Sequence, residues 1–398
     1  MPVLKPKKAA SAASSYRPIS LLETIGKVFE RILTNRLHHH LCSTGGYNED
    51  QYGFIPHLGT THAIATAAGR IYQNHTRDRR GRVAIINRDV SAAFDRTWIA
   101  GLQYKIAKLG LPTSEARVLI SYLQDRTSQV RIDGWLGPNF PITAGVPQGG
   151  VLSPTLYNIY TADTPAPLHR NYNIIYADDV TQIINISGPS VRAVEVKIRQ
   201  EAERIREFER RWKITTNEGK FRTTVMEMNK KVQNINKEPG NILGLRLTKS
   251  GYGAQVDHNI KMGKIALSHL RQLHFLTPRA QLSFYKLAIR PLLAYPPVPL
   301  NTIARTPMLK LQRIQNKALR MVFRKDWNDG LLTSELHSKY NLPPLNIFIN
   351  RLADNIWQRV REIKPEVPLE IEAHIPSMKK TDNIRNPMKN YNNDPIIT

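Results

Sequence analysis

Cysteine, long apolar runs and, over one long stretch, acidic residues are scarce in this 398-residue chain. Cys42 is the single cysteine, which excludes an internal disulfide and any multi-cysteine zinc site. The longest apolar stretches, such as residues 287–300 with Arg290 inside, are too short or interrupted to cross a bilayer. The opening residues, MPVLKPKKAA, lack the apolar core of a secretory signal. We therefore expect an intracellular, soluble protein that does not associate with membranes.

The stretch that is poor in acids is rich in basic residues. Residues 241–325 contain fifteen Lys or Arg and one acid, Asp257, so they carry +14 of the net charge of +25. A field of this sign attracts polyanions, although overall charge would equally suit a ribosome-associated or merely soluble basic protein. The concentration of the excess favours a dedicated nucleic-acid-binding surface.

The patterning along the chain predicts an α+β protein of two or three domains. A chain of this length, 41% hydrophobic, can bury a large core. The segment up to Tyr16 is rich in Pro, Ala and Ser and is expected to be loose, and the tail from Lys364 is expected to be disordered. We expect a small antiparallel sheet within the first 250 residues and a basic, helical second part. The predicted strands are 83–89, 130–133, 173–186 (a hairpin) and 241–247, and the predicted helices are 21–41, 92–109, 191–212, 266–273, 280–294 and 308–322.

The first predicted helix carries an apolar stripe and three consecutive histidines. Apolar residues from Leu22 to Leu37 recur at helical spacing and fall on one stripe of the predicted helix. His38, His39 and His40 would point in three directions on a helix. We therefore do not expect them to bind a metal ion together.

Three acids stand at the ends of strand-like runs: Asp89, Asp178 and Asp179. A single Asp after a strand is usually a turn or a helix cap. Adjacent acids within an apolar hairpin, however, repel each other and lose hydration unless a cation neutralises them. Mg²⁺ takes oxygen ligands of this kind, and a pair of such ions can assist phosphoryl displacement. Combined with the basic charge, the cluster indicates chemistry on phosphodiesters or nucleotides.

The helix predicted over residues 308–322 has a cationic ridge. Its basic residues recur at spacings of three and four, which places them on one face of about four turns. An adjacent apolar stripe would seat the helix on the body of the protein. The pattern suits a phosphate backbone, and it would also suit a calmodulin target or a membrane surface. The ridge residues are Lys310, Arg313, Lys317, Arg320 and Arg324.

Five ordered blocks carry a family resemblance. They are YRPISLLETIGKVFE (16–30), QYGFIPHLGTTHAI (51–64), DVSAAFD (89–95), GVPQGGVLSP (145–154) and YADD (176–179). Together they resemble the reverse transcriptase of non-LTR retrotransposons, most like the insect jockey group. The later segments WKITTNEGKF (212–221), ILGLRL (242–247) and LQRIQNKALRMVF (311–323) also match, so the resemblance covers residues 4–360 or so.

The resemblance implies a right-hand polymerase. Fingers and palm would occupy residues 1–240, with the fingers incomplete, and a thumb-like basic region would occupy residues 241–330. A helical extension over residues 331–363 and the disordered tail over 364–398 would follow. The implied reaction adds dNTPs to a primer 3′-hydroxyl on an RNA template, in the presence of two Mg²⁺ ions, for which Mn²⁺ could substitute.

The resemblance also assigns roles to single residues. Asp89, Asp178 and Asp179 would bind the metal ions, with the Val90 carbonyl as a further ligand. Phe94 would lie beneath the sugar and exclude a 2′-hydroxyl, unless it is an ordinary core residue.

Other roles concern the nucleotide. Gln148 can donate and accept at once, and Gly149 belongs to a glycine-rich turn that allows close backbone approach, so both suit contact with template or nucleotide. Lys220 would stand near the leaving pyrophosphate. Arg17 and Lys7 would hold the triphosphate, although each suits a surface position equally.

Some features depart from the family. No segment resembles the endonuclease of complete elements, so we expect nicking by a separate protein, and the Pro-rich YPPVPL (295–300) suggests an altered thumb. The chain also resembles a truncated copy. Two alternatives to an active polymerase therefore stay open: a decayed nucleic-acid-binding remnant, and a metal-dependent nuclease or phosphatase. The family's use of nicked genomic DNA as primer predicts a nuclear protein, with a cytoplasmic ribonucleoprotein as the alternative.

Overall fold

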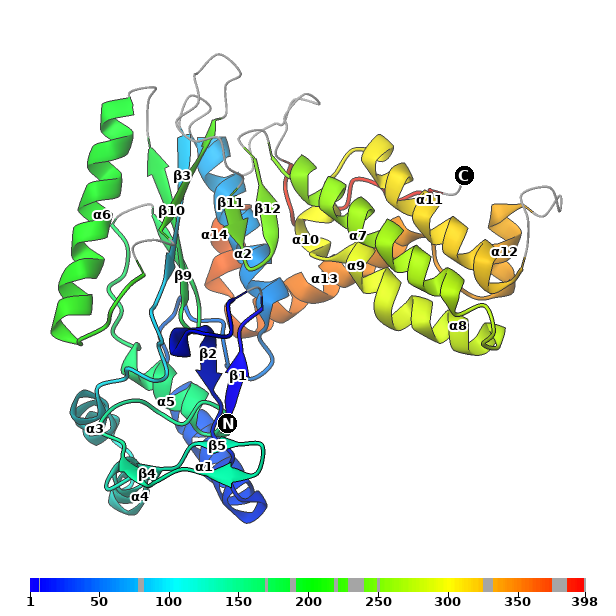
Figure 1. Ribbon diagram of the computed structural model, residues 1–398. Helices are drawn as coiled ribbons and strands as arrows, with labels where there is room; N and C mark the ends of the chain where they lie inside the picture. The colour runs from blue at the N-terminus through cyan, green and yellow to red at the C-terminus, as the bar shows by residue number, and fades with distance from the viewer. Residues whose placement is uncertain are drawn as a thin grey trace. The chain divides into compact units, whose positions relative to one another are not determined.

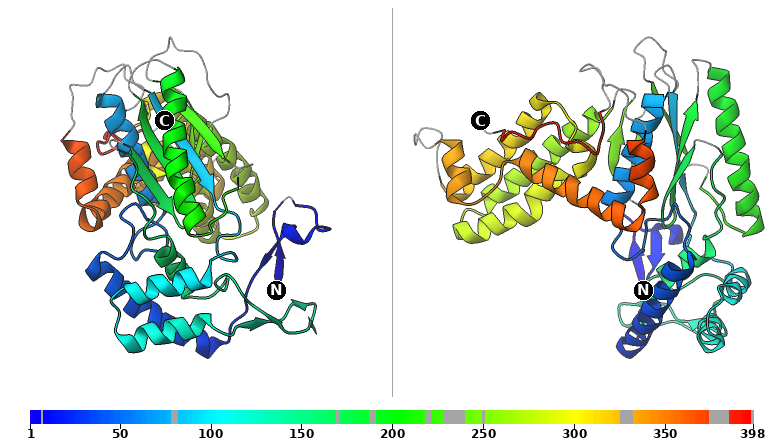
Figure 2. Two further views of the ribbon diagram at one scale, coloured as in Figure 1. Left: turned by 90° about the vertical axis from the view of Figure 1, so that its left-hand side faces the viewer. Right: turned by 180° about the vertical axis from the view of Figure 1, so that it is seen from behind.

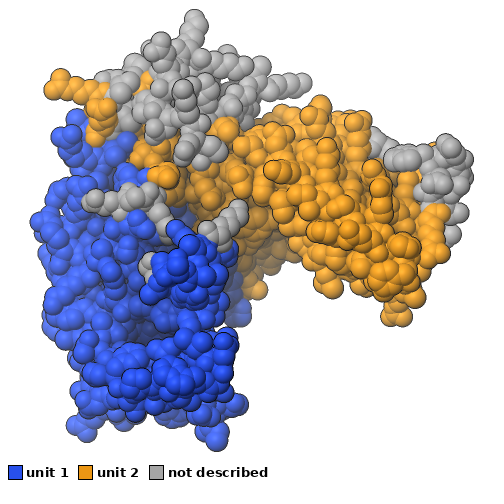
Figure 3. All heavy atoms as spheres, in the orientation of Figure 1, with its two compact units in different colours: residues 1–59, 88–181, 196–221 blue, residues 60–87, 182–195, 222–398 orange. Residues whose placement is uncertain are grey.

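The computed structural model describes residues 1–6, 8–77, 82–168, 171–186, 191–217, 221–227, 240–248, 251–324, 332–373 and 385–396 (Figure 1). The chain divides into two compact units, coloured separately in Figure 3. Unit 1 contains residues 1–59, 88–181 and 196–221, and unit 2 contains residues 60–87, 182–195 and 222–398.

The elements confirm the α+β class, with small antiparallel sheets in the first 250 residues and helices after them. The strands are β1 (Pro2–Leu4), β2 (Tyr16–Pro18), β3 (Arg82–Asp89), β4 (Thr127–Ser128), β5 (Arg131–Ile132), β6 (Trp135–Leu136), β7 (Phe140–Pro141), β8 (Tyr172–Tyr176), β9 (Asp179–Ile186), β10 (Arg222–Glu227), β11 (Gly240–Ile242) and β12 (Leu245–Leu247). The longer helices are α1 (Thr24–Thr44), α2 (Thr60–Arg77), α3 (Ile99–Lys108), α4 (Thr113–Leu123), α5 (Ser153–Tyr160), α6 (Val191–Arg211), α7 (Gly253–Gln272), α11 (Arg305–Val322) and α13 (Leu345–Ile363). The shorter ones are α8 (Pro278–Phe284), α9 (Arg290–Ala294), α10 (Pro297–Leu300), α12 (Thr333–Lys339) and α14 (Glu366–Glu372), and a π-helical turn spans Tyr285–Ile289.

The largest sheet has the strand order β10-β3-β9-β8. Residues 82–86 of β3 and 181–186 of β9 are buried, as expected for central strands flanked on both sides. β10 pairs antiparallel with β3, from Arg222 opposite Asn87 to Glu227 opposite Arg82. Strands β8 and β9 are joined by a two-residue turn at residues 177–178. The predicted hairpin is thus confirmed, with its acids at the tip.

Three local expectations are wrong. The opening segment forms a two-stranded sheet, in which Val3 pairs with Arg17, and is not wholly loose. The helix predicted from residue 92 begins at Ile99, because residues 91–96 form turns in which Ala92 has a φ of 50°. The strand predicted over 241–247 is a hairpin, β11–β12, since Leu243 and Gly244 both adopt positive φ and reverse the chain.

The outward face of α1 is apolar. Ile25 is 85% exposed, and Val28, Phe29 and Ile32 are each at least half exposed. The helical stripe is therefore buried only in its C-terminal part, at Leu37. The histidines that follow have separate partners: His38 contacts the Tyr47 hydroxyl and His40 the Leu109 carbonyl, so they do not form a common site.

Helix α11 has two polar faces of different kinds. Its inner face buries Gln312, Gln315 and Asn316 completely. Gln312 bonds to Asn316 (2.7 Å), to His337 of α12 (3.2 Å) and to the backbone N–H of Leu345 (2.6 Å). These bonds fix the rotation of α11, so its opposite, cationic face points to solvent. Burial lowers the pKa of His337, which keeps its ring neutral within this network.

The tail is ordered where the structure describes it. Helix α14 packs on α2 and α13, as the two views of Figure 2 allow the reader to follow. Ile396 is buried, and Asn346 donates to the carbonyls of Asn392 (2.9 Å) and Asp394 (2.8 Å). The prediction of a disordered tail is therefore wrong for residues 366–372 and 385–396. No helix in the described part of the chain is long and apolar enough to span a membrane.

Candidate active site and cationic groove

The three predicted carboxylates lie in unit 1, at the ends of neighbouring strands. Asp89 is the last residue of β3, Asp178 lies in the turn after β8, and Asp179 is the first residue of β9. In Figure 1, β3 and β9 run in opposite directions, so Asp89 and Asp179 fall at the same edge of the sheet. Among the described residues, no group of three or more His, Cys, Asp or Glu side chains gathers closely enough to hold a metal ion.

The main chain at Asp89 and Val90 is held by residues 215–217. The Asp89 carbonyl accepts from Asn217 N–H at 2.8 Å, and Ser91 N–H donates to the Thr215 carbonyl at 2.8 Å. Val90 and Thr216 therefore form the non-hydrogen-bonded pair of an antiparallel bridge. In such a pair the N–H and C=O point away from the partner strand. The Val90 carbonyl thus faces the side of β3 where β9 lies.

A buried ion pair lies beside Asp89. The Arg88 guanidinium contacts Glu209 of α6 at 3.1 Å, and the two side chains are 4% and 13% exposed. Glu209 also accepts from the Thr216 hydroxyl, and Arg88 donates to the Ala202 carbonyl at 3.3 Å. Burial lowers the pKa of Arg88, and the Glu209 carboxylate opposes that shift. Glu209 therefore joins the strand that carries Asp89 to the segment that pairs with it.

The second sequence block holds the turn that carries Asp178. Gln51 Oε1 accepts from the backbone N–H of Gly53 (2.8 Å) and of Ala177 (3.0 Å). Ala177 has a φ of 58°, an unusual value for a residue other than glycine, so this bond supports a strained turn. A Cβ at Gly53 would lie 2.5 Å from the Ala177 nitrogen, which explains the glycine there.

Aromatic rings connect the third block to the same turn. Phe94 is half-buried, with its ring centroid 5.1 Å from that of Tyr157 and 6.5 Å from that of Phe54. Burial raises the pKa of Tyr157, and the negative charge of Asp178 raises it further. Tyr157 therefore contacts Phe94, is influenced by the charge of Asp178 and stays protonated at neutral pH.

The glycine-rich loop at residues 145–150 is fixed from two directions. Val146 N–H donates to the Phe94 carbonyl (2.7 Å), and Ser20 N–H donates to the Gln148 carbonyl (2.7 Å). Gly149 has a φ of 120°, and a Cβ there would lie 2.8 Å from the Ser20 oxygen. The side-chain oxygen of Gln148 is buried and accepts no hydrogen bond from the described residues. It is thus a buried acceptor without a hydrogen-bond partner among the described residues.

The predicted triphosphate ligands are less well placed. Arg17 lies on β2 with its side chain exposed, and no described contact joins it to the carboxylates. Lys7 and Lys220 lie outside the described residues.

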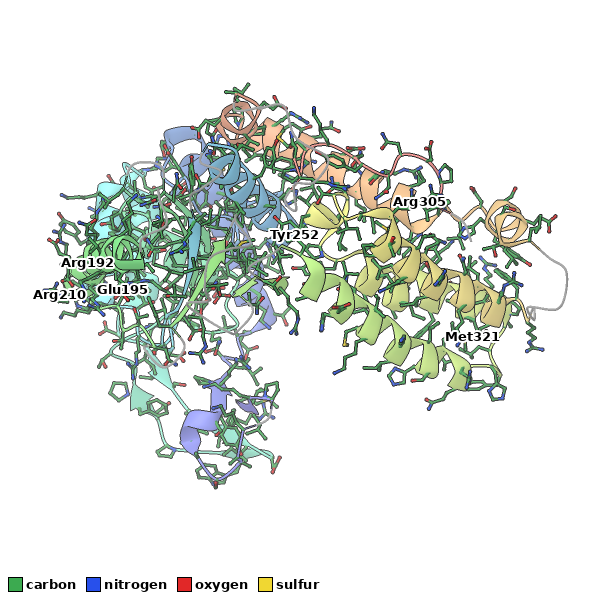
Figure 4. All side chains as sticks on the ribbon, turned by 90° about the horizontal axis from the view of Figure 1, so that it is seen from above. Arg192, Glu195, Arg210, Tyr252, Arg305 and Met321 are labelled. Atoms are coloured by element: carbon green, nitrogen blue, oxygen red, sulfur yellow. The ribbon has the colours of Figure 1, made fainter. Side chains whose placement is uncertain are left out.

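Unit 2 contains a groove of about 490 Å³ between α7 and α11. Five of its ten lining residues are Lys or Arg, and none is acidic. Figure 4 shows the two helices side by side, with Met321, a lining residue, labelled near the end of α11. The groove has an apolar floor and cationic walls, which are formed by Lys264 and Arg271 of α7 and by Lys310, Arg313 and Lys317 of α11.

The predicted cationic ridge is corrected at its far end. Arg320 is only 6% exposed, because α12 covers it where Arg320 approaches Thr333 at 3.5 Å. Arg324 is exposed but lies beyond the end of α11, where it donates to the His274 carbonyl at 3.2 Å. The exposed ridge on the helix therefore consists of Lys310, Arg313 and Lys317.

Sequence reasoning missed several residues that build the site. Gln51 belongs to the second sequence block, but no role was predicted for it. Tyr157 and Glu209 lie between the blocks. Lys264 and Arg271 belong to the basic stretch. They are seven residues apart, which places them on the same face of a helix, and this spacing could have indicated their role.

Comparisons with known proteins show the family to which the chain belongs. Residues 5–247 match the family described as Reverse transcriptase (RNA-dependent DNA polymerase). The chain is 30% identical over 375 residues to the probable RNA-directed DNA polymerase from transposon X-element of Drosophila melanogaster, covering 89% of this chain and 40% of that protein. It is 26% identical over 382 residues to the RNA-directed DNA polymerase from mobile element jockey of Drosophila melanogaster, with the same coverage. The chain thus spans about two fifths of the length of these curated relatives.

A solved structure of telomerase from Candida Tropicalis, in complex with a fragment of telomeric RNA, has a TM-score of 0.41 at 13% identity and covers 89% of this chain and 57% of that chain. The family match spans more than half of the chain and includes all five blocks. The chain therefore belongs to the reverse transcriptase (RNA-dependent DNA polymerase) family and is similar to the enzymes of jockey-like non-LTR retrotransposons, as the blocks predicted.

Proposed function

We propose that this chain is an RNA-directed DNA polymerase that adds dNTPs to a primer 3′-hydroxyl. One observation carries the proposal: contacts join all five sequence blocks, although these lie far apart in the chain, and Gln51 of the second block holds the turn that bears Asp178. The contacts run from Gln51 to Ala177, from Phe94 to the Val146 backbone and from Ser20 to Gln148. Relatives whose names describe RNA-directed DNA polymerases support the same activity.

The donor chemistry of the sheet edge suits a divalent metal ion, since carboxylates and a main-chain carbonyl are the hard oxygen ligands that Mg²⁺ prefers. Asp89, Asp178, Asp179 and the Val90 carbonyl would hold it. When bound, Mg²⁺ would supply charge neutralisation at the phosphate and a lower pKa for the primer hydroxyl. The protein's own part is to keep these oxygens at one edge and to seat the reactants beside them.

The remaining site residues act on the nucleotide. The Phe94 ring packs against Phe54 and Tyr157. Its edge would collide with the 2′-hydroxyl of a bound ribonucleotide, so it would select dNTPs. The unpartnered Gln148 oxygen would accept from the template or the incoming nucleotide. Neither group needs to move a proton, so this part of the site selects and orients.

A primer-extension assay tests the proposed activity. We expect the purified chain, given poly(rA) annealed to oligo(dT), dTTP and Mg²⁺, to lengthen the primer, and to do nothing when dTTP is replaced by rUTP. A chain that binds the hybrid but never extends it would instead be a catalytically inactive remnant.

The cationic groove would bind the hybrid backbone. Exchanging Lys264, Lys310 and Lys317 for Gln removes three positive charges, so we expect weaker binding and a smaller salt dependence. The slope of log K against log salt should fall by about 2 to 3, at roughly 0.7–0.9 per phosphate contact. Fluorescence anisotropy with a labelled hybrid at several salt concentrations measures both quantities.

The matched control for the groove is Lys261→Gln. Lys261 is exposed on the same helix as Lys264 but does not line the groove. If this control loses as much affinity and slope per charge removed as the triple variant does, net charge, and not the groove, attracts the nucleic acid.

A further inference from the structure

A single carboxylate from α1 caps the helix that follows the glycine-rich loop. Glu30 is 5% exposed. Its Oε2 accepts from the backbone N–H of Val151 (2.6 Å) and of Leu152 (3.1 Å). Its Oε1 accepts from the Tyr122 hydroxyl at 3.0 Å. The carboxylate therefore binds backbone N–H groups at the start of α5, where a negative charge is favoured.

This cap differs from an ordinary helix cap in its position in the sequence. Helix caps usually come from the residue at the helix start, but Leu152, which occupies that place here, has no side chain that can cap. The cap comes instead from 121 residues earlier in the chain. Glu30 thus joins α1 to α5. Its hydrogen bond with Tyr122 also joins both helices to α4.

Two parts of the candidate site depend on the hydrogen bonds that Glu30 makes to Val151 and Leu152. The loop with Gln148 and Gly149 ends immediately before Val151, so its C-terminal end is anchored by Glu30. Tyr157, which contacts Phe94, lies on the capped helix. Ser20 anchors the same loop at the Gln148 carbonyl. The first sequence block, residues 16–30, therefore fixes the loop through two of its residues, Ser20 near the start of the block and Glu30 at its end.

We propose that Glu30 is a positioning residue for the nucleotide, acting through the 145–150 loop and α5. This inference rests on the proposed polymerase function. Glu30 touches no reactant; it sets where Gln148 and Phe94 stand relative to the acids. Its loss should consequently raise the KM for dNTP and lower kcat, whereas binding of the nucleic-acid hybrid in the groove of unit 2 should not change.

Graded variants separate positioning from simple stability. Glu30→Ala removes all three hydrogen bonds, and we expect kcat/KM for dTTP to fall roughly tenfold or more. Tyr122→Phe removes one bond. Glu30→Gln keeps an oxygen for Val151 and Leu152, and its amide can donate to the Tyr122 oxygen, so we expect most of the activity to be rescued.

Glu115→Ala is the matched control, because Glu115 also joins α1 to α4 through its 3.3 Å contact with Arg36, at the surface. Each variant is assayed below its melting temperature, with hybrid affinity and hydrogen exchange of residues 145–152 measured beside activity. Faster exchange there with a raised KM supports the inference. Unchanged kcat and KM in Glu30→Ala, whatever its melting temperature, overturn it. If the wild-type chain neither extends a primer nor binds dTTP, the proposed function itself fails.

Discussion

The chain carrying Asp178→Asn and Asp179→Asn is expected to extend no primer measurably, with a rate loss on the order of 10³ or more. Asn keeps the size of each side chain and hydrogen-bonding groups but removes the charge that would attract the metal ion and screen the phosphates. Because one acid is half-buried and the other exposed, at the tip of a hairpin, neither substitution opens a cavity. Single-nucleotide incorporation by rapid quench is the measurement.

The control for this pair is Asp133→Asn. Asp133 lies in an exposed turn of another hairpin, β5–β6, in the same unit, and its positive φ is one that Asn tolerates. We expect this control to retain full activity, and we expect all three chains to bind the hybrid equally. Residual extension above one per cent in the double variant would show that these acids are not the essential ones.

The second large effect concerns stability. Glu209→Ala should lower the free energy of unfolding by about 3–5 kcal/mol, because it leaves the Arg88 guanidinium buried without its counter-charge. Thr216 loses its acceptor in the same substitution, so the pairing of residues 215–217 with Asp89 is weakened as well. Urea unfolding followed by tryptophan fluorescence measures the change.

Two comparisons make this result specific. Glu203, on the same helix, pairs with Arg210 at 2.6 Å, but their side chains are 58% and 70% exposed. Glu203→Ala should therefore cost less than about 1 kcal/mol. The double variant Arg88→Leu, Glu209→Leu should recover much of the loss, since it leaves no unpaired charge. Equal destabilisation by Glu203→Ala and Glu209→Ala would contradict the buried-pair interpretation.

Much of the fold followed from periodicity, and the exceptions have physical causes. The hairpin around Asp178 was predictable because β-branched runs flank a pair of acids. The helix expected from residue 92 was not, since Ala92 adopts a positive φ and the Phe94 carbonyl accepts from Val146 N–H, which lies far along the chain. The tail was misjudged because its Asn-rich composition suggests disorder, whereas Asn346 and Trp357 donate hydrogen bonds that hold it in place.

The site was predictable where chemistry is carried by the residue type itself. Carboxylates, glycines and clustered lysines can be recognised as candidate site residues from the sequence alone. Glu30 and Gln51 do not, because their roles depend on partners more than one hundred residues away. The burial of Arg320 was equally hidden, since only the packing of α12 removes it from the ridge.

Helix α11 illustrates how differently two faces of one element can change over evolutionary time. On its solvent side, one lysine or arginine can replace another with little consequence. On its inner side, Gln312, Asn316 and His337 contact one another in a buried cluster, so an exchange at any one of them removes a polar contact from each of the other two. Sequence drift should therefore be tolerated residue by residue on the outside, whereas a change within the inner trio should favour a compensating change in its neighbours.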